Sequence, residues 1–298
     1  MTHTLNGSSS GDVLRVAAVQ MNSRDDKEAN VATALELIDR AAGSGARLVA
    51  LPEVWTYLGP DPGIPDAAEP IPGPTIERLA EPARRHGIYL HCGSVYERAA
   101  GEPRLFNTTV VVDPRGEIVA KYRKIHMYDV DLAGGESYRE SATNAPGDEI
   151  VTFDLDGVTV GLAICYDLRF PEIFRILALR GAEVIVLPAA FTLTTGKDVW
   201  EVLIRARAIE NQLFMVAAGQ VGAHPTSAGG NAWCYGRSMI VNPLGTVQAV
   251  AYDEATVVTS DLDLAYLRRV RRQVPSLANR MPDRYRWPET ARAGVLGD

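Results

Sequence analysis

The sequence predicts an α/β protein in which helices cover one mixed sheet or two sheets. Short apolar runs of strand length alternate with amphipathic helical patterns along the whole chain. Two pairs of these runs are joined by tight turns, which places antiparallel hairpins beside βα units. No internal repeat and no low-complexity linker divides the 298 residues, so we expect a single domain.

The first half of the chain begins with a βα unit and a second strand. The strands are "LRVAAVQ" at 14–20 and "ARLVALPE" at 46–53, and the amphipathic helix between them ends in a Gly-rich stretch. The segment from Tyr57 to Pro74 carries six prolines and is expected to be a long loop without regular structure. A helix at about 75–86 and three strands follow, and "PRG" joins the last two strands in a hairpin. These strands are expected at 87–97, 105–113 and 117–124.

The second half of the chain adds a further hairpin and more βα units. The hairpin pairs 149–155 with 158–165 across Asp156-Gly157, a favoured two-residue turn. A helix is expected to open at Pro171 because proline favours the first helical turn. The remaining expected elements are a strand at 183–189, a helix at 199–212, strands at 213–220, 237–251 and 255–263, and a last helix before an irregular tail.

Composition and charge exclude several classes of partner. The formal net charge is −7 and the pI about 5.4, so no extended basic face is available to bind nucleic acid. The short basic cluster "LRRVRR" at 267–272 is interpreted as a solvated or inter-subunit helix face. The three cysteines are far apart and form no CxxC motif, which suggests neither a disulfide framework nor a zinc cluster.

The termini and the apolar runs suggest a cytoplasmic protein without a membrane partner. The N-terminus has no apolar segment typical of a signal peptide, and no apolar run approaches the ~20 residues of a membrane span. Residues 1–11, rich in Ser and Gly, are expected to be a disordered tail. The domain would then span 12–298, with a C-terminal extension from about 275.

Cys165 is the first candidate for chemistry. The strand preceding it delivers this residue to a strand end, where functional residues of α/β sheets gather and where unpaired amides can stabilise an anion. Free cysteine is also among the most buried residue types, so position alone leaves a structural role open.

A cysteine nucleophile needs a base. Of the five histidines, His126 and His224 could serve, which keeps a Cys–His hydrolase or transferase open. Glu53 is the other candidate, because it follows a buried strand and burial raises the pKa of a carboxyl group. An acidic residue in this position can also be a salt-bridged cap.

Lys124 is a candidate buried cation. Strand alternation places Ile118, Ala120, Tyr122 and Lys124 on one face, and Val119, Lys121 and Arg123 on the other. A lysine beside a developing oxyanion would stabilise it, although a lysine at a strand end is often solvated.

These residues and their order resemble the carbon–nitrogen hydrolase family, or nitrilase superfamily. The likeness is carried by "LPE" at Glu53, "YRKIH" at Lys124 and "GLAICYDLRFPE" at Cys165, and it extends from about Leu14 to Tyr285. It implies an αββα sandwich of two mixed sheets with outer helices, assembled as homodimers or larger homo-oligomers. It is closest to the omega-amidase and deaminated glutathione amidase branch.

The resemblance also implies a Glu–Lys–Cys triad. Glu53 would be the general base, Cys165 the nucleophile that forms a thioester, and Lys124 the cation that stabilises the oxyanion together with the backbone amide of Tyr166. A second glutamate of the site would be Glu140, with Glu136 as the nearby competitor. No metal or organic cofactor is implied.

The branch implies hydrolysis of the carboxamide of short carboxylate-bearing amides, such as α-ketoglutaramate, with release of ammonia. N-carbamyl amino acid amidohydrolase, aliphatic amidase and nitrilase activities are the alternatives within the superfamily, and an inactive binding module is the alternative outside it. Arg169 is expected either to bind the substrate carboxylate or to fix the turn by pairing with Asp167 or Glu172. Tyr57, Phe191 and Thr192 are candidate pocket walls.

Overall fold

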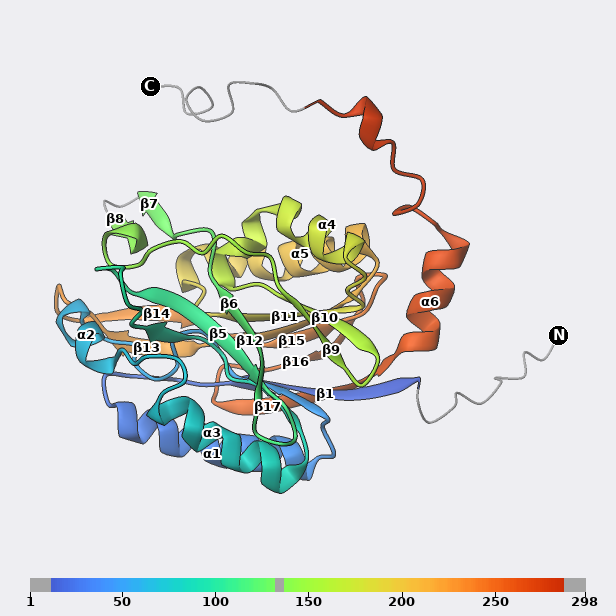
Figure 1. Cartoon of the computed structure of the whole chain (residues 1–298). Coiled ribbons are helices and arrows are strands. Elements are labelled where there is room, and N and C mark those ends of the chain that lie inside the picture. Colours follow the sequence, from blue (N-terminus) through green and yellow to red (C-terminus); the bar gives the residue numbers. More distant parts are fainter. Residues whose placement is uncertain (1–11, 132–136, 287–298) are drawn as a thin grey trace.

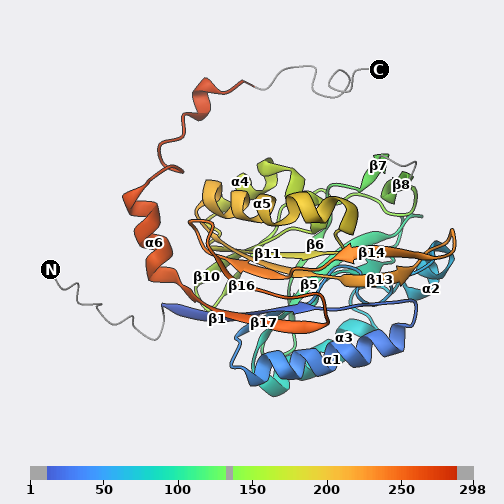
Figure 2. The same cartoon turned by 180° about the vertical axis from the view of Figure 1, so that it is seen from behind.

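Two sheets pack face to face and helices cover both outer surfaces. The computed structural model describes residues 12–131 and 137–286. Helices α1 (Lys27–Gly43) and α3 (Pro74–His86) lie outside the first sheet, and α4 (Pro171–Leu179) and α5 (Leu193–Asn211) lie outside the second (Figures 1 and 2). The predicted fold class, an αββα sandwich, is therefore confirmed.

The first sheet is mixed and contains seven of the described strands, in the order β17-β1-β2-β3-β5-β4 with β6 paired to β5. Strands β1, β2 and β3 run parallel, and the others join antiparallel. Its strands are β1 (Val13–Gln20), β2 (Leu48–Ala50), β3 (Tyr89–His91), β4 (Val95–Glu97), β5 (Phe106–Val112), β6 (Ile118–Arg123) and β17 (Thr256–Asp263).

The second sheet contains six described strands in the order β16-β15-β12-β11-β10-β9. Its centre, β10-β11-β12, is parallel, as the βα units predict. Its strands are β9 (Thr152–Leu155), β10 (Val158–Leu162), β11 (Val184–Ala189), β12 (Phe214–Gly219), β15 (Met239–Val241) and β16 (Val247–Val250).

The parallel strands β1 and β2 of the first sheet are buried on both faces, except at the start of β1, which explains their nearly continuous apolar sequences. In β1, Val16 and Ala18 pack into the core between the sheets, whereas Ala17 and Val19 pack against the helix side. Helix α1 comes next in the chain. Asp26 caps the N-terminus of this helix by accepting a hydrogen bond from the Ala29 amide. The Asp156-Gly157 turn joins β9 to β10 with φ of 51° and 89°, as the predicted hairpin requires.

Gly93 explains why the strand predicted at 87–97 is two strands, β3 and β4. Its φ is 61°, and a Cβ atom there would lie 2.2 Å from the carbonyl oxygen of Pro52. Only glycine allows this close approach. The break in the strand therefore brings the chain against the residue that precedes Glu53.

Other predicted boundaries were also wrong. The proline-rich segment holds the 3₁₀ helix Asp61–Gly63 and helix α2 (Ile64–Ala67), because prolines in first-turn positions fit a helix. Helix α5 begins at Leu193, six residues before the predicted start at 199.

Two small hairpins were not expected from the sequence, and they stand apart from the main sheets (Figure 1). They are β7 (Asp129–Asp131) with β8 (Ser137–Arg139), and β13 (Val221–Pro225) with β14 (Asn231–Tyr235). The Ser227 hydroxyl, between β13 and β14, accepts a hydrogen bond from the Asp61 amide at 2.8 Å, so this hairpin contacts the proline-rich segment.

The chain ends with helix α6 (Leu264–Gln273) and a largely exposed segment that contains the 3₁₀ helix Pro282–Arg284. In Figures 1 and 2 most of this segment lies outside the sandwich, although Leu277 in it packs against the core. The predicted tail at 1–11 lies outside the described residues, and the limits of the single domain stay a prediction. In the described parts of the chain, no helix is both long enough and apolar enough to cross a membrane.

Candidate active site

The candidate residues follow strands of both sheets. Glu53 follows β2 and Lys124 follows β6 in the first sheet, whereas Cys165 follows β10 in the second. The packing of the sheets brings these strand ends together. All three side chains are buried.

A buried ion cluster joins Lys124 to two carboxylates. Its Nζ donates to Glu53 Oε1 at 3.0 Å and to Glu140 Oε2 and Oε1 at 2.8 and 3.1 Å. The side chain of Lys124 is only 2% exposed. Strand alternation correctly predicted this burial, since Ala120 and Tyr122 on the same face are also buried.

Burial alone would lower the pKa of Lys124, but the neighbouring Glu140 and Glu53 carboxylates outweigh it and raise that pKa well above its ordinary value. The lysine is therefore a permanent cation. It is held by electrostatic attraction in a buried site.

Asn107 on β5 belongs to the same cluster, and sequence reasoning missed it. Its Nδ2 donates to Glu53 Oε1 at 2.8 Å and to Glu140 Oε1 at 3.3 Å. The backbone amides of Ala190 and Tyr128 each donate at 2.7 Å, to Glu53 Oε2 and Glu140 Oε2 respectively. Each carboxylate oxygen thus has at least one donor.

Cys165 begins a 3₁₀ helix, Cys165–Arg169, with a left-handed φ of 43°. Val54, directly after Glu53, has a φ of 42°. Such backbone is strained for residues other than glycine and is typical of functional sites. The Glu53 carboxylate and the Ala190 amide are both near enough to the thiol to influence its pKa.

Burial raises the pKa of the Cys165 thiol well above its ordinary value, the Glu53 carboxylate raises it further, and Lys124 opposes them. The resting group is therefore a thiol rather than a thiolate. A nucleophile in this state needs a base close to it, and the Glu53 carboxylate is close enough to influence the thiol's pKa.

Asp167 fixes the turn that carries Cys165. This fully buried carboxylate accepts from the Ile164 amide at 2.8 Å and from the Tyr122 hydroxyl at 2.6 Å. His126 Nδ1 lies 2.7 Å from the same carboxylate, and the ring stacks on Phe170. Asp167 therefore ties β6 of the first sheet to the end of β10 in the second.

The alternative histidine bases face other partners. His126 is engaged by Asp167, and His224 Nδ1 lies 3.9 Å from the sulfur of Cys234. No contact within the described residues joins a histidine to Cys165. A Cys–His pair at Cys165 is therefore absent from this part of the chain.

A small cavity opens beside Cys165. Its volume is about 20 Å³, roughly the space of one water molecule. It is lined by Tyr128, Cys165, Tyr166, Ala190, Phe191, Thr192 and Thr195. Phe191 and Thr192 thus lie where the sequence placed them. Tyr57 is not among these lining residues, because its hydroxyl donates to the Pro60 carbonyl and its ring packs in a separate apolar cluster.

Arg169 lies against the aromatic wall of this cavity. Its guanidinium carbon is 5.4 Å from the centre of the Phe191 ring and 5.9 Å from that of Tyr166. The predicted alternative, pairing with Asp167 or Glu172, is wrong, since Asp167 is bonded to other groups and the described residues provide no ion pair for Arg169.

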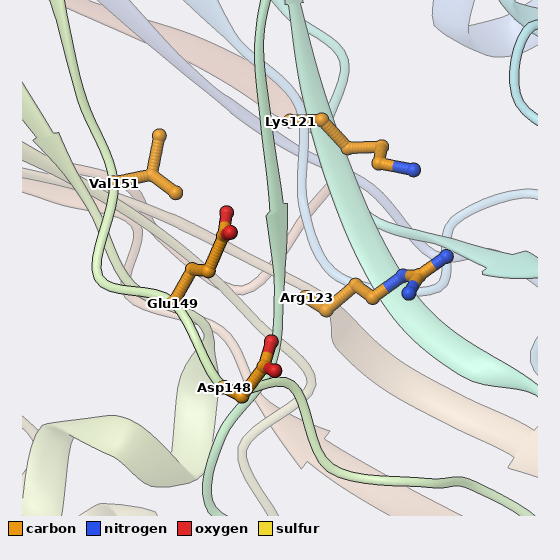
Figure 3. A pocket seen from close by; sticks show the side chains of 5 residues that line it. All are labelled: Lys121, Arg123, Asp148, Glu149 and Val151. Carbon is orange, nitrogen blue, oxygen red and sulfur yellow. The ribbon is translucent and has the colours of Figure 1, made fainter.

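A larger cavity, of about 240 Å³, lies elsewhere (Figure 3). It is lined by Lys121, Arg123, Asp148, Glu149 and Val151. Lys121 and Arg123 belong to the face of β6 opposite Tyr122, and both pair with Glu97. This cavity contains no nucleophile, so we locate the site by its chemistry and not by cavity size.

Glu140 joins the ion cluster, whereas its competitor Glu136 lies outside the described residues. Within residues 12–131 and 137–286, no group of three or more His, Cys, Asp or Glu side chains is arranged to hold a metal ion.

Comparison with known proteins gives relatives over most of the chain. Omega-amidase NIT2 of Homo sapiens is 42% identical over 271 residues, which cover 91% of this chain and 96% of that protein. The NitFhit protein of C. elegans matches in structure with a TM-score of 0.84 at 33% identity, over 92% of this chain and 66% of that longer chain.

A third relative is an amidase from Nesterenkonia sp. AN1. A solved variant of it carries the acetamide moiety of fluoroacetamide covalently added at the active-site cysteine. It matches with a TM-score of 0.74 and 25% identity, over 93% of this chain and 98% of that one.

The family model described as carbon-nitrogen hydrolase matches residues 15–272, a span that includes every residue of the ion cluster and the cavity. Family match, relatives and fold agree, and the chain belongs to the carbon–nitrogen hydrolase family.

Proposed function

We propose that this protein is an amidase that hydrolyses the terminal carboxamide of short, carboxylate-bearing amides, with Cys165 as nucleophile and Glu53 as general base. Membership of the carbon–nitrogen hydrolase family and the relatives named omega-amidase support amide C–N hydrolysis. The observation that carries the residue assignment is the burial of Cys165 close to Glu53, whose carboxylate influences the thiol's pKa and is itself bonded to buried Lys124.

In the first step, Glu53 takes the thiol proton while the Cys165 sulfur attacks the amide carbon. The raised pKa of the thiol supports concerted removal of the proton, since little free thiolate exists beforehand. The cysteine adduct in the Nesterenkonia amidase supports a cysteine nucleophile in this family.

The tetrahedral intermediate carries an oxyanion. Lys124 would stabilise it together with the backbone amide of Tyr166, which has no acceptor among the described residues. Removing one such donor typically costs about 3 kcal/mol in the activation barrier. Glu140 acts on the reaction through Lys124, whose ammonium group it orients.

In the second half of the reaction, Glu53 returns its proton to the leaving nitrogen and ammonia departs, leaving a thioester. A water molecule, deprotonated by the same carboxylate, attacks the thioester and releases the carboxylic acid and the thiol. One amide and one water thus give one carboxylic acid and one ammonia.

Arg169 supports a substrate that bears a carboxylate. It does not itself line the cavity but lies against the Tyr166 and Phe191 rings that do. Its guanidinium has no carboxylate partner in the described chain, and such a group favours an anionic ligand. A substrate of this class is larger than the cavity of about 20 Å³, so the half-buried side chains around it must move on binding.

We also infer a cytoplasmic homodimer or larger homo-oligomer. Free Cys92, Cys165 and Cys234 suit a reducing compartment. Exposed Ile176 and Leu179 on α4, with Val202 and Ile209 on α5, provide an apolar surface for helix-on-helix contact. Sedimentation velocity would detect the assembly, and a purely monomeric protein would contradict it.

Ammonia release from a substrate panel tests the proposed function. The panel contains α-ketoglutaramate, succinamate, deaminated glutathione, an N-carbamyl amino acid, aliphatic amides and an aromatic nitrile. We expect the carboxylate-bearing amides to give the highest kcat/KM. Preference for the nitrile or the carbamyl compound would overturn the substrate class but leave the nucleophile in place.

A matched pair of variants tests the base. We expect Glu53→Gln to reduce kcat by at least ~1000-fold because proton transfer is lost. His126→Asn should retain most activity, since His126 contacts Asp167 and not Cys165. Equal losses in both variants would instead support a histidine base.

A further inference from the structure

Tyr128 has a hydroxyl group that the described protein leaves without a partner. The residue lies between β6 and β7 and lines the cavity beside Cys165. Its hydroxyl oxygen is buried and makes no hydrogen bond, although the Thr192 hydroxyl is near enough to influence its pKa. An unsatisfied buried hydroxyl costs about 1–3 kcal/mol and calls for an explanation.

The position of this hydroxyl is tightly determined. The Tyr128 amide donates to Glu140 Oε2 at 2.7 Å, and its carbonyl accepts from the Glu140 amide at 3.3 Å. Its ring packs edge-on against Tyr166 at 5.1 Å and tilted against Tyr138 at 5.8 Å. The backbone of Tyr128 is therefore fixed by Glu140 of the ion cluster, and its ring is fixed by the neighbouring aromatic rings. Together these contacts determine where the hydroxyl lies.

The surroundings of the hydroxyl favour an anionic acceptor. Arg169 lies against Tyr166 and Phe191 of the same wall and is close enough to Tyr128 to lower its pKa, although burial keeps that pKa above its ordinary value. The hydroxyl thus remains a proton donor at neutral pH. A group that suits both an O–H donor and a guanidinium is a carboxylate.

We propose that the Tyr128 hydroxyl donates a hydrogen bond to the distal carboxylate of the substrate, next to Arg169, and so makes Tyr128 a specificity-determining residue. The inference rests on the proposed function, because it names the protein group that recognises the substrate's second end. It explains why a buried donor beside the nucleophile has no protein partner.

Tyr128→Phe tests the inference because it removes only the hydroxyl. Succinamate and butyramide have the same number of carbon atoms, and only the former carries a carboxylate. We expect KM for succinamate to rise about 10- to 100-fold with kcat within about threefold, as for loss of one hydrogen bond to a charged group. The ratio of kcat/KM for succinamate over butyramide should fall by the same factor.

Tyr138→Phe is the matched control. It removes a hydroxyl from the neighbouring ring, which does not line the cavity. It should leave the selectivity ratio within about twofold of the wild type. A merely structural role of Tyr128 would lower activity on both substrates together, and that result would overturn the inference.

Two further outcomes separate this inference from the proposed function. If the wild type hydrolyses succinamate and Tyr128→Phe keeps its selectivity, the hydroxyl does not bind the carboxylate and the amidase proposal stands. If the wild type releases no ammonia from any amide of the panel, both fail. Inhibition by succinate should weaken about 10-fold or more in Tyr128→Phe, and unchanged inhibition would contradict carboxylate recognition.

Discussion

The ion cluster and the cavity wall lie side by side but satisfy their polar groups differently. In the ion cluster, Lys124, Glu53 and Glu140 are bonded to one another, and Asn107 donates to both carboxylates. In the wall, the Tyr128 hydroxyl lacks a partner and Arg169 lacks an ion pair among the described residues. The groups proposed to act in the chemistry are preorganised, whereas those proposed to recognise the substrate remain available for a ligand.

The largest effect should come from breaking the ion cluster. Lys124→Met leaves two buried carboxylates facing each other, and we expect the free energy of unfolding to fall by about 3–5 kcal/mol. Lys121→Met, on β6 just before Lys124, removes one of the two cations that pair with Glu97, and its side chain is 41% exposed. We expect a loss of at most about 1 kcal/mol for this control. Equal losses in urea denaturation would show that the cluster stabilises the fold no more than an ion pair with one half-exposed partner.

Cys165 lies between the ion cluster and the cavity wall. Its titration should change the free energy of unfolding with pH, by less than the loss of Lys124 does. Burial raises the thiol's pKa in the folded protein, whereas the unfolded thiol titrates near about 8.5. This stabilising contribution is fully present below that pH and is lost as the pH rises, because only the unfolded chain releases the proton. Relative to Cys165→Ala, the wild type should lose about 1.4 kcal/mol per pH unit above 8.5, or about 2 kcal/mol at pH 10.

Urea denaturation of both proteins at pH 7, 8, 9 and 10 measures this difference. The other titrating groups, including Cys92 and Cys234, are present in both proteins and cancel. A difference that stays constant over this range would mean that the folded thiol ionises like a free one.

The smallest effect on stability should come from the wall. Arg169→Gln should change the free energy of unfolding by less than about 0.5 kcal/mol, since no ion pair is lost. Arg207→Gln is the contrast, because buried Arg207 donates to the Leu168 carbonyl and to Glu210, and should cost about 1.5–3 kcal/mol. KM for succinamate should rise about tenfold in Arg169→Gln. A destabilised Arg169→Gln would mean that the arginine supports the fold after all.

The parts of the site that could be predicted from sequence are those with a local signal. Lys124 is recognisable because strand alternation places it with buried Ala120 and Tyr122. Asn107 has no such signal, since it reads as an ordinary strand residue and its carboxylate partners are 54 and 33 positions away in sequence. Long-range contacts of this kind depend on the packing of the whole fold.

The parts of the fold that could be predicted were likewise those with a local signal in the sequence. Strands and helices with clear periodicity were predicted, whereas the break at Gly93 depends on a contact with Pro52 from another strand's end. One of the two roles considered for Arg169, the ion pair that would fix the turn, was wrong for a similar reason. Asp167, its proposed partner, is already occupied by Tyr122 of the opposite sheet.

The division of the site between two sheets has a consequence for folding. Glu53 and Lys124 follow strands of the first sheet, and Cys165 and Ala190 follow strands of the second. Either sheet formed alone would hold only part of the reaction machinery, because the thiol reaches its base only once the sheets have packed together. The recovery of ammonia release during refolding therefore reports when the two sheets pack together. It should occur later than the signal of any probe that reports strand formation within one sheet.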